Sequence, residues 1–170
     1  MKFSSPLLVV SNMETAKHFY YEVLGLEVIF DFGANVTLTG GIALQTKDTW
    51  LKFIRKKDHE IVFGGNAAEL YFEEDDFEGF LQKINVIADI NYVHPLLEHS
   101  WGQRVVRFYD PDKHIIEVGE NLMMVVRRFI NSGLSVEETA IRMDVPVDYI
   151  KSCLDSHAAI AAPADDENRS

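Results

Sequence analysis

One order of secondary-structure elements occurs twice along the chain, and this repeat limits the possible folds more than any other feature. In the first half, Leu7–Val10 is a short apolar strand. A helix follows, because apolar residues recur there with the spacing of one helical face: Ala16, Phe19, Tyr20 and Val23. Ser11 and Glu14 have the spacing of a capping box at the start of this helix, and Gly25 ends it. Three strands follow within residues 26–46.

The second half repeats this order after a loosely patterned connector at residues 47–66. A strand is expected at 68–73, and an apolar helical face then recurs at Phe77, Phe80, Leu81 and Ile84. Further strands are expected within residues 90–118. A β-α-β-β-β order that occurs twice predicts two similar modules, at about residues 1–46 and 67–120.

The last two strands form a hairpin around the turn Asp110–Lys113, since proline fixes one turn dihedral and aspartate side chains bond their own backbone. The first strand of the hairpin is expected at residues 103–109, after a loop at 95–100. On the second strand, at 114–118, Glu117 lies between two apolar residues. If its face of the strand lines a cavity, Glu117 is a ligand or a base. If that face meets water, it is an ordinary strand glutamate.

A three-part signature surrounds this hairpin: Trp101-Gly102, Asp110-Pro111-Asp112 and Ile116-Glu117. It resembles the signature of the vicinal oxygen chelate superfamily, the group of glyoxalase I, bleomycin- and fosfomycin-resistance proteins and extradiol dioxygenases. Lys113 stands where the superfamily usually has glycine, so a positive φ at this residue would carry modest strain.

The resemblance covers residues 1–120 and implies an α+β fold, in which paired βαβββ modules form a curved mixed sheet around a cavity. Such modules pair within one chain or across a dimer, and we expect a homodimer. The resemblance also implies that the cavity binds a small organic molecule, with metal-assisted or glutamate-assisted lyase or isomerase chemistry. A noncatalytic protein that sequesters a drug or senses a ligand is the alternative, because this architecture hosts unrelated functions.

By resemblance, metal ligands come from the first and the closing strand of each module. These positions fall on Ser5, on Gln45 or Ala43 depending on register, on Glu69 and on Glu117. Glu69, Glu117 and Gln45 are therefore the candidate metal ligands. An all-oxygen set suits Mg²⁺ or Mn²⁺ better than Zn²⁺.

The same two carboxylates also allow metal-free chemistry. If Glu117 and Glu69 face each other in a semi-closed cavity, repulsion and desolvation raise the pKa of one of them, which could then act as a base. The opposing interpretation is that both are polar groups of the cavity wall satisfied by hydrogen bonds. His114 has the opposite strand parity to Glu117, and none of the histidines is assigned a role.

Candidate substrate-binding residues are Trp101, Arg107 and Phe53. Arg104 and Arg107 have opposite parity on one strand, so only one of them can face the cavity; the sequence leaves this register open. Whichever faces inward could pair with a glutamate or hold an anionic substrate. Aromatic residues could line a cleft or pack in the core: Trp50, Phe53, Phe72, Trp101 and Phe108.

Residues 121–157 change to a helical pattern, in which Ser135 and Glu138 form a second capping box. This extension resembles a helix-turn-helix and has three interpretations: DNA recognition, packing against the sheet or a dimer partner, or a lid over the cavity. Its few basic residues are offset by acidic ones, which argues against DNA. Residues 158–170 are small, acidic and polar, a composition typical of a disordered tail.

The composition narrows the class further. The 170 residues include 27 acidic and 16 basic side chains, for a formal charge of −11, which argues against binding to a phosphate backbone. The single cysteine, Cys153, excludes an intrachain disulfide and suits a reducing compartment. No apolar run reaches the length of a signal segment or a bilayer span. We therefore expect a soluble cytoplasmic protein whose partner is a small molecule.

Overall fold

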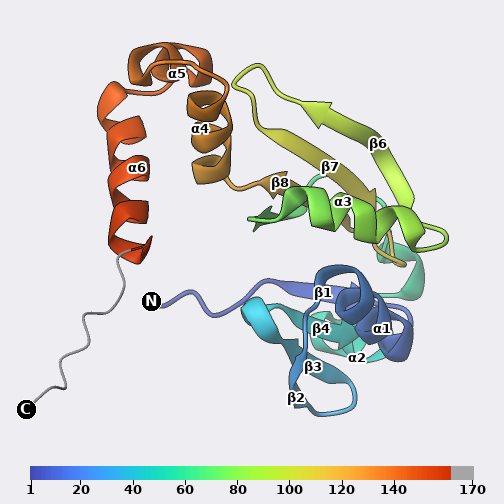
Figure 1. Ribbon diagram of the computed structural model, residues 1–170. Coiled ribbons are helices and arrows are strands. Elements are labelled where there is room, and N and C mark those ends of the chain that lie inside the picture. Colours follow the sequence, from blue (N-terminus) through green and yellow to red (C-terminus); the bar gives the residue numbers. More distant parts are fainter. Residues whose placement is uncertain (162–170) are drawn as a thin grey trace, which may run out of the picture. The chain divides into compact units, whose positions relative to one another are not determined.

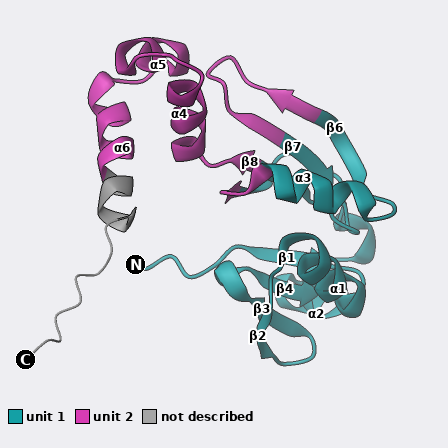
Figure 2. Ribbon diagram, viewed as in Figure 1, with its two compact units in different colours: residues 1–72, 78–95, 106–118 teal, residues 73–77, 96–105, 119–170 magenta. Residues whose placement is uncertain are grey.

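The computed structural model describes residues 1–161, with side chains through Asp155 (Figure 1). Two compact units divide the chain, unit 1 with residues 1–72, 78–95 and 106–118, and unit 2 with residues 73–77, 96–105 and 119 onward (Figure 2). Within the described residues, no helix has the length and apolar character to cross a bilayer.

The first module forms a four-stranded mixed sheet. Its elements are β1 (Leu7–Val10), α1 (Met13–Leu24), β2 (Val28–Asp31), β3 (Asn35–Leu38) and β4 (Ala43–Thr46). The strand order is β1-β4-β3-β2, with β1 parallel to β4 and the other neighbours antiparallel. Val9 is the register partner of Gln45, so the first strand and the closing strand of the module lie side by side.

The second module repeats this arrangement. Its elements are β5 (Glu69–Glu74), α3 (Phe77–Val86), β6 (Asn91–Glu98), β7 (Arg104–Tyr109) and β8 (Ile115–Glu120), with strand order β5-β8-β7-β6. In both sheets the first strand pairs with the fourth, the fourth with the third and the third with the second. The predicted α+β fold with two βαβββ modules is confirmed.

Helix α1 shows how local sequence sets these elements. Its N-cap is Asn12, whose side chain accepts the Thr15 amide at 2.9 Å, so the capping box predicted at Ser11 and Glu14 was wrong. Ser11 instead donates its amide to the Asp112 carboxylate at 3.1 Å. Gly25 ends the helix in the left-handed conformation, as predicted.

Strand β6 corrects another prediction. The sequence indicated a strand at residues 90–93 and a loop at 95–100, but β6 continues through Pro95 to Glu98. The strand order explains this, since β6 is an edge strand. On an edge strand one side of the backbone has no neighbouring strand, so a missing amide hydrogen is tolerated there.

The connector and the extension are helical. The connector contains α2 (Lys47–Ile54) and a short 3₁₀ turn at Asp58–Glu60. The extension contains α4 (Leu122–Asn131), α5 (Val136–Met143) and α6 (Val147–Ala161), with Asn121 as the N-cap of α4. Helix α6 therefore continues past residue 157, and residues 162–170 of the predicted tail lie outside the described residues.

The three extension helices enclose a small core of their own within unit 2, made of Val125, Val126, Phe129, Ala140, Met143 and Ile150. Leu122 and Leu134 are among the partly buried residues packed against it. The extension is therefore a packed module and not a single appended helix.

Candidate functional site

Arg107 joins the two glutamates that the sequence singled out, within unit 1. Its Nε donates to Glu69 Oε2 at 3.0 Å, and its Nη2 forms an ion pair with Glu117 Oε2. Its Nη1 donates to His94 Nε2 at 3.2 Å. Glu69, Arg107 and Glu117 come from the neighbouring strands β5, β7 and β8, which explains how residues far apart in sequence meet. The register question is resolved: Arg107, and not Arg104, pairs with these glutamates.

The partners of His94 indicate which of its ring nitrogens donates and which accepts. Because a guanidinium only donates, the Nε2 that faces Arg107 must accept. The Nδ1 lies 2.7 Å from the Pro95 carbonyl and carries the hydrogen. His94 therefore accepts from the third nitrogen of the guanidinium whose other two nitrogens pair with the glutamates.

The guanidinium changes what the two carboxylates can do. Their mutual repulsion was the expected reason for one of them to act as a base, and a cation bound to both offsets that repulsion. Glu117 is only 5% exposed, so its charge depends on Arg107. The geometry therefore shows two carboxylates paired with one cation, and Glu117 Oε2 has this ion pair but no hydrogen bond among the described residues.

The side chains predicted as ligands of a divalent metal have other partners in the structure. Gln45 Nε2 donates to the Ala34 carbonyl at 2.9 Å and to the Thr49 hydroxyl, and its Oε1 accepts from Asn35 Nδ2 at 2.9 Å. Its amide is therefore committed within the first module, while Arg107 engages both carboxylates. Among the side chains that the structure describes, no three His, Cys, Asp or Glu residues are grouped to hold a metal ion.

The other predicted substrate-binding residues belong to other parts of the chain. Phe53, on α2, is 69% exposed. Trp101 belongs to unit 2, where its ring stacks on His99 with centroids 4.2 Å apart and its Nε1 donates to Gln103 Oε1 at 3.3 Å. Phe108, a candidate for the aromatic cleft, is fully buried and packs as a core residue.

Unit 1 contains a cavity of about 250 Å³ with Glu69 on its wall. Its walls come from the start of β1, the start of β5 and the start of β8, with these lining residues: Pro6, Leu7, Leu8, Ala68, Glu69, Leu70, His114 and Ile115. The walls are mostly apolar, and Glu69 and His114 supply the polar side chains.

Asp110 holds His114 at this wall. Asp110 Oδ2 accepts from His114 Nδ1 and from the Tyr20 hydroxyl, each at 2.9 Å. Its Oδ1 accepts the backbone amides of Asp112 at 2.9 Å and His114 at 2.8 Å. Burial, together with the neighbouring Asp110 charge, raises the pKa of Tyr20 well above its ordinary value, so the hydroxyl remains a donor. The carboxylate is 2% exposed and held by four donors.

From the sequence, His114 was assigned no place at a cavity, because only the strand face of Glu117 was considered and His114 has the opposite parity. The signal was present in the turn motif, where a histidine directly follows Asp110–Lys113 and lies four residues after Asp110. Lys113 has φ 68°, so the turn keeps the left-handed residue that the motif requires, with the strain expected for a side chain there.

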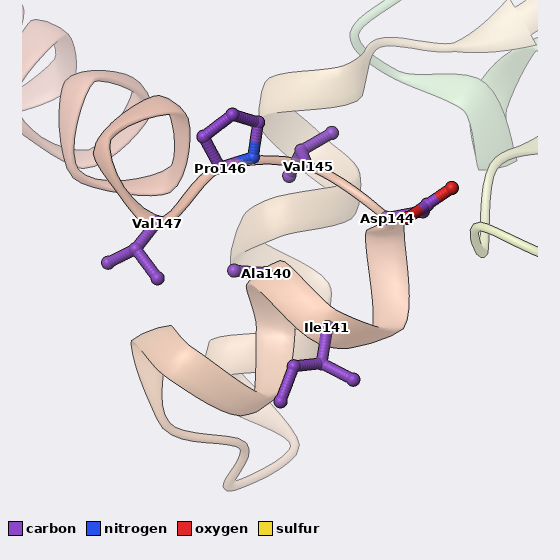
Figure 3. A pocket seen from close by; sticks show the side chains of 6 residues that line it. All are labelled: Ala140, Ile141, Asp144, Val145, Pro146 and Val147. Carbon is purple, nitrogen blue, oxygen red and sulfur yellow. The ribbon is translucent and has the colours of Figure 1, made fainter.

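A larger hollow of about 600 Å³ lies in unit 2, where α5 connects to α6. Figure 3 shows its lining: Ala140, Ile141, Asp144, Val145, Pro146 and Val147. Asp144 is its one charged side chain. Ligand sites usually combine apolar walls with several convergent polar groups, so the smaller cavity of unit 1 is the better candidate.

Basic residues of the extension are bound within unit 2. Arg128 donates to Glu120 at 3.1 and 3.0 Å and to the Gly102 carbonyl. Arg142 donates to Glu98 at 3.1 Å and to the Ser100 carbonyl. Both guanidinium groups also lie over the Phe129 ring, 5.0 and 5.3 Å from its centroid. These contacts leave fewer free cations for a phosphate backbone.

The doubled βαβββ module, with a cavity and an Arg-bridged pair of glutamates in unit 1, defines a protein of the vicinal oxygen chelate type. Residues 3–123 match the family model described as a glyoxalase-like domain, and the chain belongs to this family. No curated protein matches the sequence.

Solved structures agree with this assignment. A protein of unknown function from Agrobacterium tumefaciens is 37% identical, with a TM-score of 0.64, over 71% of this chain and 94% of that one. A member of the glyoxalase/bleomycin resistance protein/dioxygenase superfamily from Sphaerobacter thermophilus is 24% identical, with a TM-score of 0.56, over 71% and 98%. An enzyme of the same family from Burkholderia phytofirmans is 15% identical, with a TM-score of 0.60, over 69% and 96%. The last two show the shared fold alone.

Proposed function

We propose that this chain is a small-molecule-binding protein whose site is the unit 1 cavity. The observation that carries the proposal is the composition of the wall: leucine and isoleucine side chains with two polar groups, Glu69 and His114. Apolar walls give affinity, and a few fixed polar groups give orientation. The cavity lies within residues 3–123, the part of the chain that matches the glyoxalase-like family.

Binding without catalysis has better support than lyase or isomerase chemistry at the glutamates. A base must be free to accept a proton from the ligand. Arg107 engages both Glu69 and Glu117, and the latter is buried. Chemistry assisted by Mg²⁺ or Mn²⁺ also has weaker support than binding. Gln45, one of the three predicted metal ligands, already forms hydrogen bonds within its own module.

The test is a fragment screen followed by amide chemical shifts, with a variant that fills the cavity. Fragments that bind should shift the amides of Leu7, Leu8 and Leu70, and Leu70→Trp should abolish these shifts. Val62→Trp is the matched control, because Val62 is 79% exposed and is not a wall residue. Fragments whose shifts map elsewhere, or persist in Leu70→Trp, would refute this site.

A homodimer and a cytoplasmic location are part of the same proposal. Support for a dimer comes from the edge strand β2 and its flank, where large apolar residues are exposed: Val28, Ile29, Phe30 and Phe32. Exposed apolar patches commonly mark interaction surfaces. The free Cys153 suits a reducing compartment. Light scattering of Phe30→Glu against the unchanged chain tests the dimer, which should dissociate in the variant.

For the extension we propose a packing role and no contact with DNA. Its apolar side chains form their own core, and Arg128 and Arg142 bind partners within unit 2. Random duplex DNA at low salt should therefore keep its mobility when the protein is added. A retarded band that disappears as salt rises would contradict this proposal.

A further inference from the structure

We propose that the unit 1 cavity selects a small organic amine, with His114 and Glu69 as the groups that accept its hydrogens. This inference rests on the proposed function and specifies the class of ligand. It follows from four observations. These are the tautomer of His114, the hydrogen bonds that hold its imidazole in place, the acceptor positions still available on Glu69, and the absence of lysine and arginine from the described residues of the wall.

The first observation is that the tautomer of His114 is fixed. A carboxylate only accepts, so the Nδ1 that lies 2.9 Å from Asp110 Oδ2 carries a hydrogen. When the ring carries this hydrogen alone, its Nε2 has a free lone pair. The ring is on the cavity wall and its side chain is 24% exposed, so a ligand can reach it.

The second observation is that the support of His114 is rigid. The Asp110 carboxylate is buried and accepts from Tyr20, from His114 Nδ1 and from two backbone amides of the turn. The Phe63 ring and the imidazole also form a T-shaped contact, with centroids 6.1 Å apart and planes at 87°. An imidazole held in this way keeps its orientation before a ligand arrives, which lowers the entropy lost on binding.

The third observation concerns Glu69. Its Oε2 accepts from Arg107 Nε at 3.0 Å, and a carboxylate has about four lone-pair positions. Its side chain is 38% exposed and is part of the cavity wall, so further acceptor positions are available to a ligand. Both polar groups of the wall are therefore acceptors, and they are complemented by a ligand that donates.

The fourth observation is charge. Among the described residues that line the cavity there is no lysine or arginine, whereas Glu69 is anionic and Asp110 lies behind His114. Arg107, which is not a wall residue, offsets part of the Glu69 charge, but two carboxylates share that guanidinium. A carboxylate or phosphate ligand would therefore meet net like charge, and an ammonium group would meet the opposite charge. The volume of about 250 Å³ is smaller than that of sites for drug-sized molecules, so a single ring or a short chain fits.

The experiment uses three matched fluorinated probes with the full chain: 4-fluorobenzylamine, 4-fluorobenzyl alcohol and 4-fluorobenzoate. Binding is measured from ¹⁹F line widths during titration at about pH 8, above the ordinary range for imidazole protonation. We expect saturable binding of the amine, weaker binding of the neutral alcohol and none of the benzoate. Long-range ¹H–¹⁵N spectra should show the hydrogen of His114 on Nδ1, and the amine should move the Nε2 signal.

Variants separate the two groups. His114→Phe should weaken the amine at least tenfold, whereas His59→Phe should not, because His59 is an exposed residue of the connector. Glu69→Gln is a second test at an exposed position where folding is not at risk, and it should remove the preference for amine over alcohol. Both variants are checked for the folded state by circular dichroism.

The outcomes distinguish this inference from the proposed function. Benzoate binding as tightly as the amine, with both lost in Leu70→Trp, would overturn the amine inference and leave a binding cavity. Amine binding unchanged in both His114→Phe and Glu69→Gln would overturn it in the same way. If none of the three probes binds while other fragments shift the wall amides, the amine inference is wrong and the proposed binding function stands. If no fragment shifts the wall amides, the amine inference and the proposed binding function are both wrong.

Discussion

Arg107 neutralises Glu117, a carboxylate that is 5% exposed on β8 and paired with the Nη2 of that guanidinium. We predict that Arg107→Met lowers the free energy of unfolding by about 3 kcal/mol, because it leaves a buried charge without a partner. Urea denaturation measures this as a lower midpoint at an unchanged m value.

The matched control for this prediction is the other carboxylate of the pair. Glu69 is bound by the same guanidinium, but its side chain is 38% exposed, so Glu69→Gln should cost less than about 1 kcal/mol. Adding Glu117→Gln to Arg107→Met should restore part of the loss. Equal losses from Arg107→Met and Glu69→Gln would show that burial of Glu117 does not determine the effect.

The contrast between what the sequence predicted and what it missed has a physical cause. Helix faces, the Gly25 cap and the Asp110–Lys113 turn depend on neighbours within a few residues, so local pattern was enough to predict them. The boundary of β6 depends on its place at the sheet edge, which local pattern does not contain.

The site shows the same limit. Glu69 and Glu117 were predicted as a pair, and in the structure they share one guanidinium. Which arginine joins them depends on strand register, and the sequence left the choice between Arg104 and Arg107 open. His114 was missed because its ring is held by the Asp110 carboxylate of the turn, which also accepts from the Tyr20 hydroxyl of α1, and its own strand face does not indicate this. Contacts of this kind join distant parts of the chain, and periodicity does not report them.

Gly102 cannot carry a side chain without moving Phe129. A Cβ built on Gly102 would overlap the ring of Phe129, and its φ is +88°. We predict that Gly102→Ala destabilises unit 2 by about 3 kcal/mol, from the clash and the backbone strain together. Thermal denaturation followed by near-UV circular dichroism measures this loss, since it reports aromatic packing.

Gly33→Ala is the control for the strain alone, because Gly33 has φ +76° and no heavy atom lies within 4 Å of a Cβ built there. It should cost only about 1–2 kcal/mol. Combining Gly102→Ala with Phe129→Leu should bring the cost of the alanine close to that of the control. If the two alanine variants cost the same in the unchanged background, the ring contact has no energetic role.

Glu120 should make unit 2 sensitive to acid. It is 3% exposed; burial alone would raise its pKa, but hydrogen bonds from Arg104 and Arg128 lower the pKa below the ordinary 4.5. A carboxyl with a lowered folded-state pKa stabilises the fold above its ordinary value, and this contribution is lost as pH falls through the folded-state pKa.

The measurement for Glu120 compares the unfolding free energies of Glu120→Gln and the unchanged chain between about pH 7 and about pH 3. The difference should be largest at neutral pH and should narrow below about pH 4.5, where the unfolded carboxyl becomes protonated. A difference that stays constant over the whole range would mean that the charge of Glu120 contributes nothing to stability.

Ser135 caps α5 through a reciprocal pair of bonds that the sequence predicted. Its Oγ accepts the Glu138 amide at 3.1 Å, and Glu138 Oε2 accepts the Ser135 amide at 2.8 Å. Ser135→Ala should cost about 1 kcal/mol and speed hydrogen exchange at the Glu138 amide, since that amide loses its acceptor. Ser135→Asp keeps an acceptor at the cap and should retain the protection. Faster exchange in both variants would mean that the hydroxyl of Ser135 acts in some way other than capping.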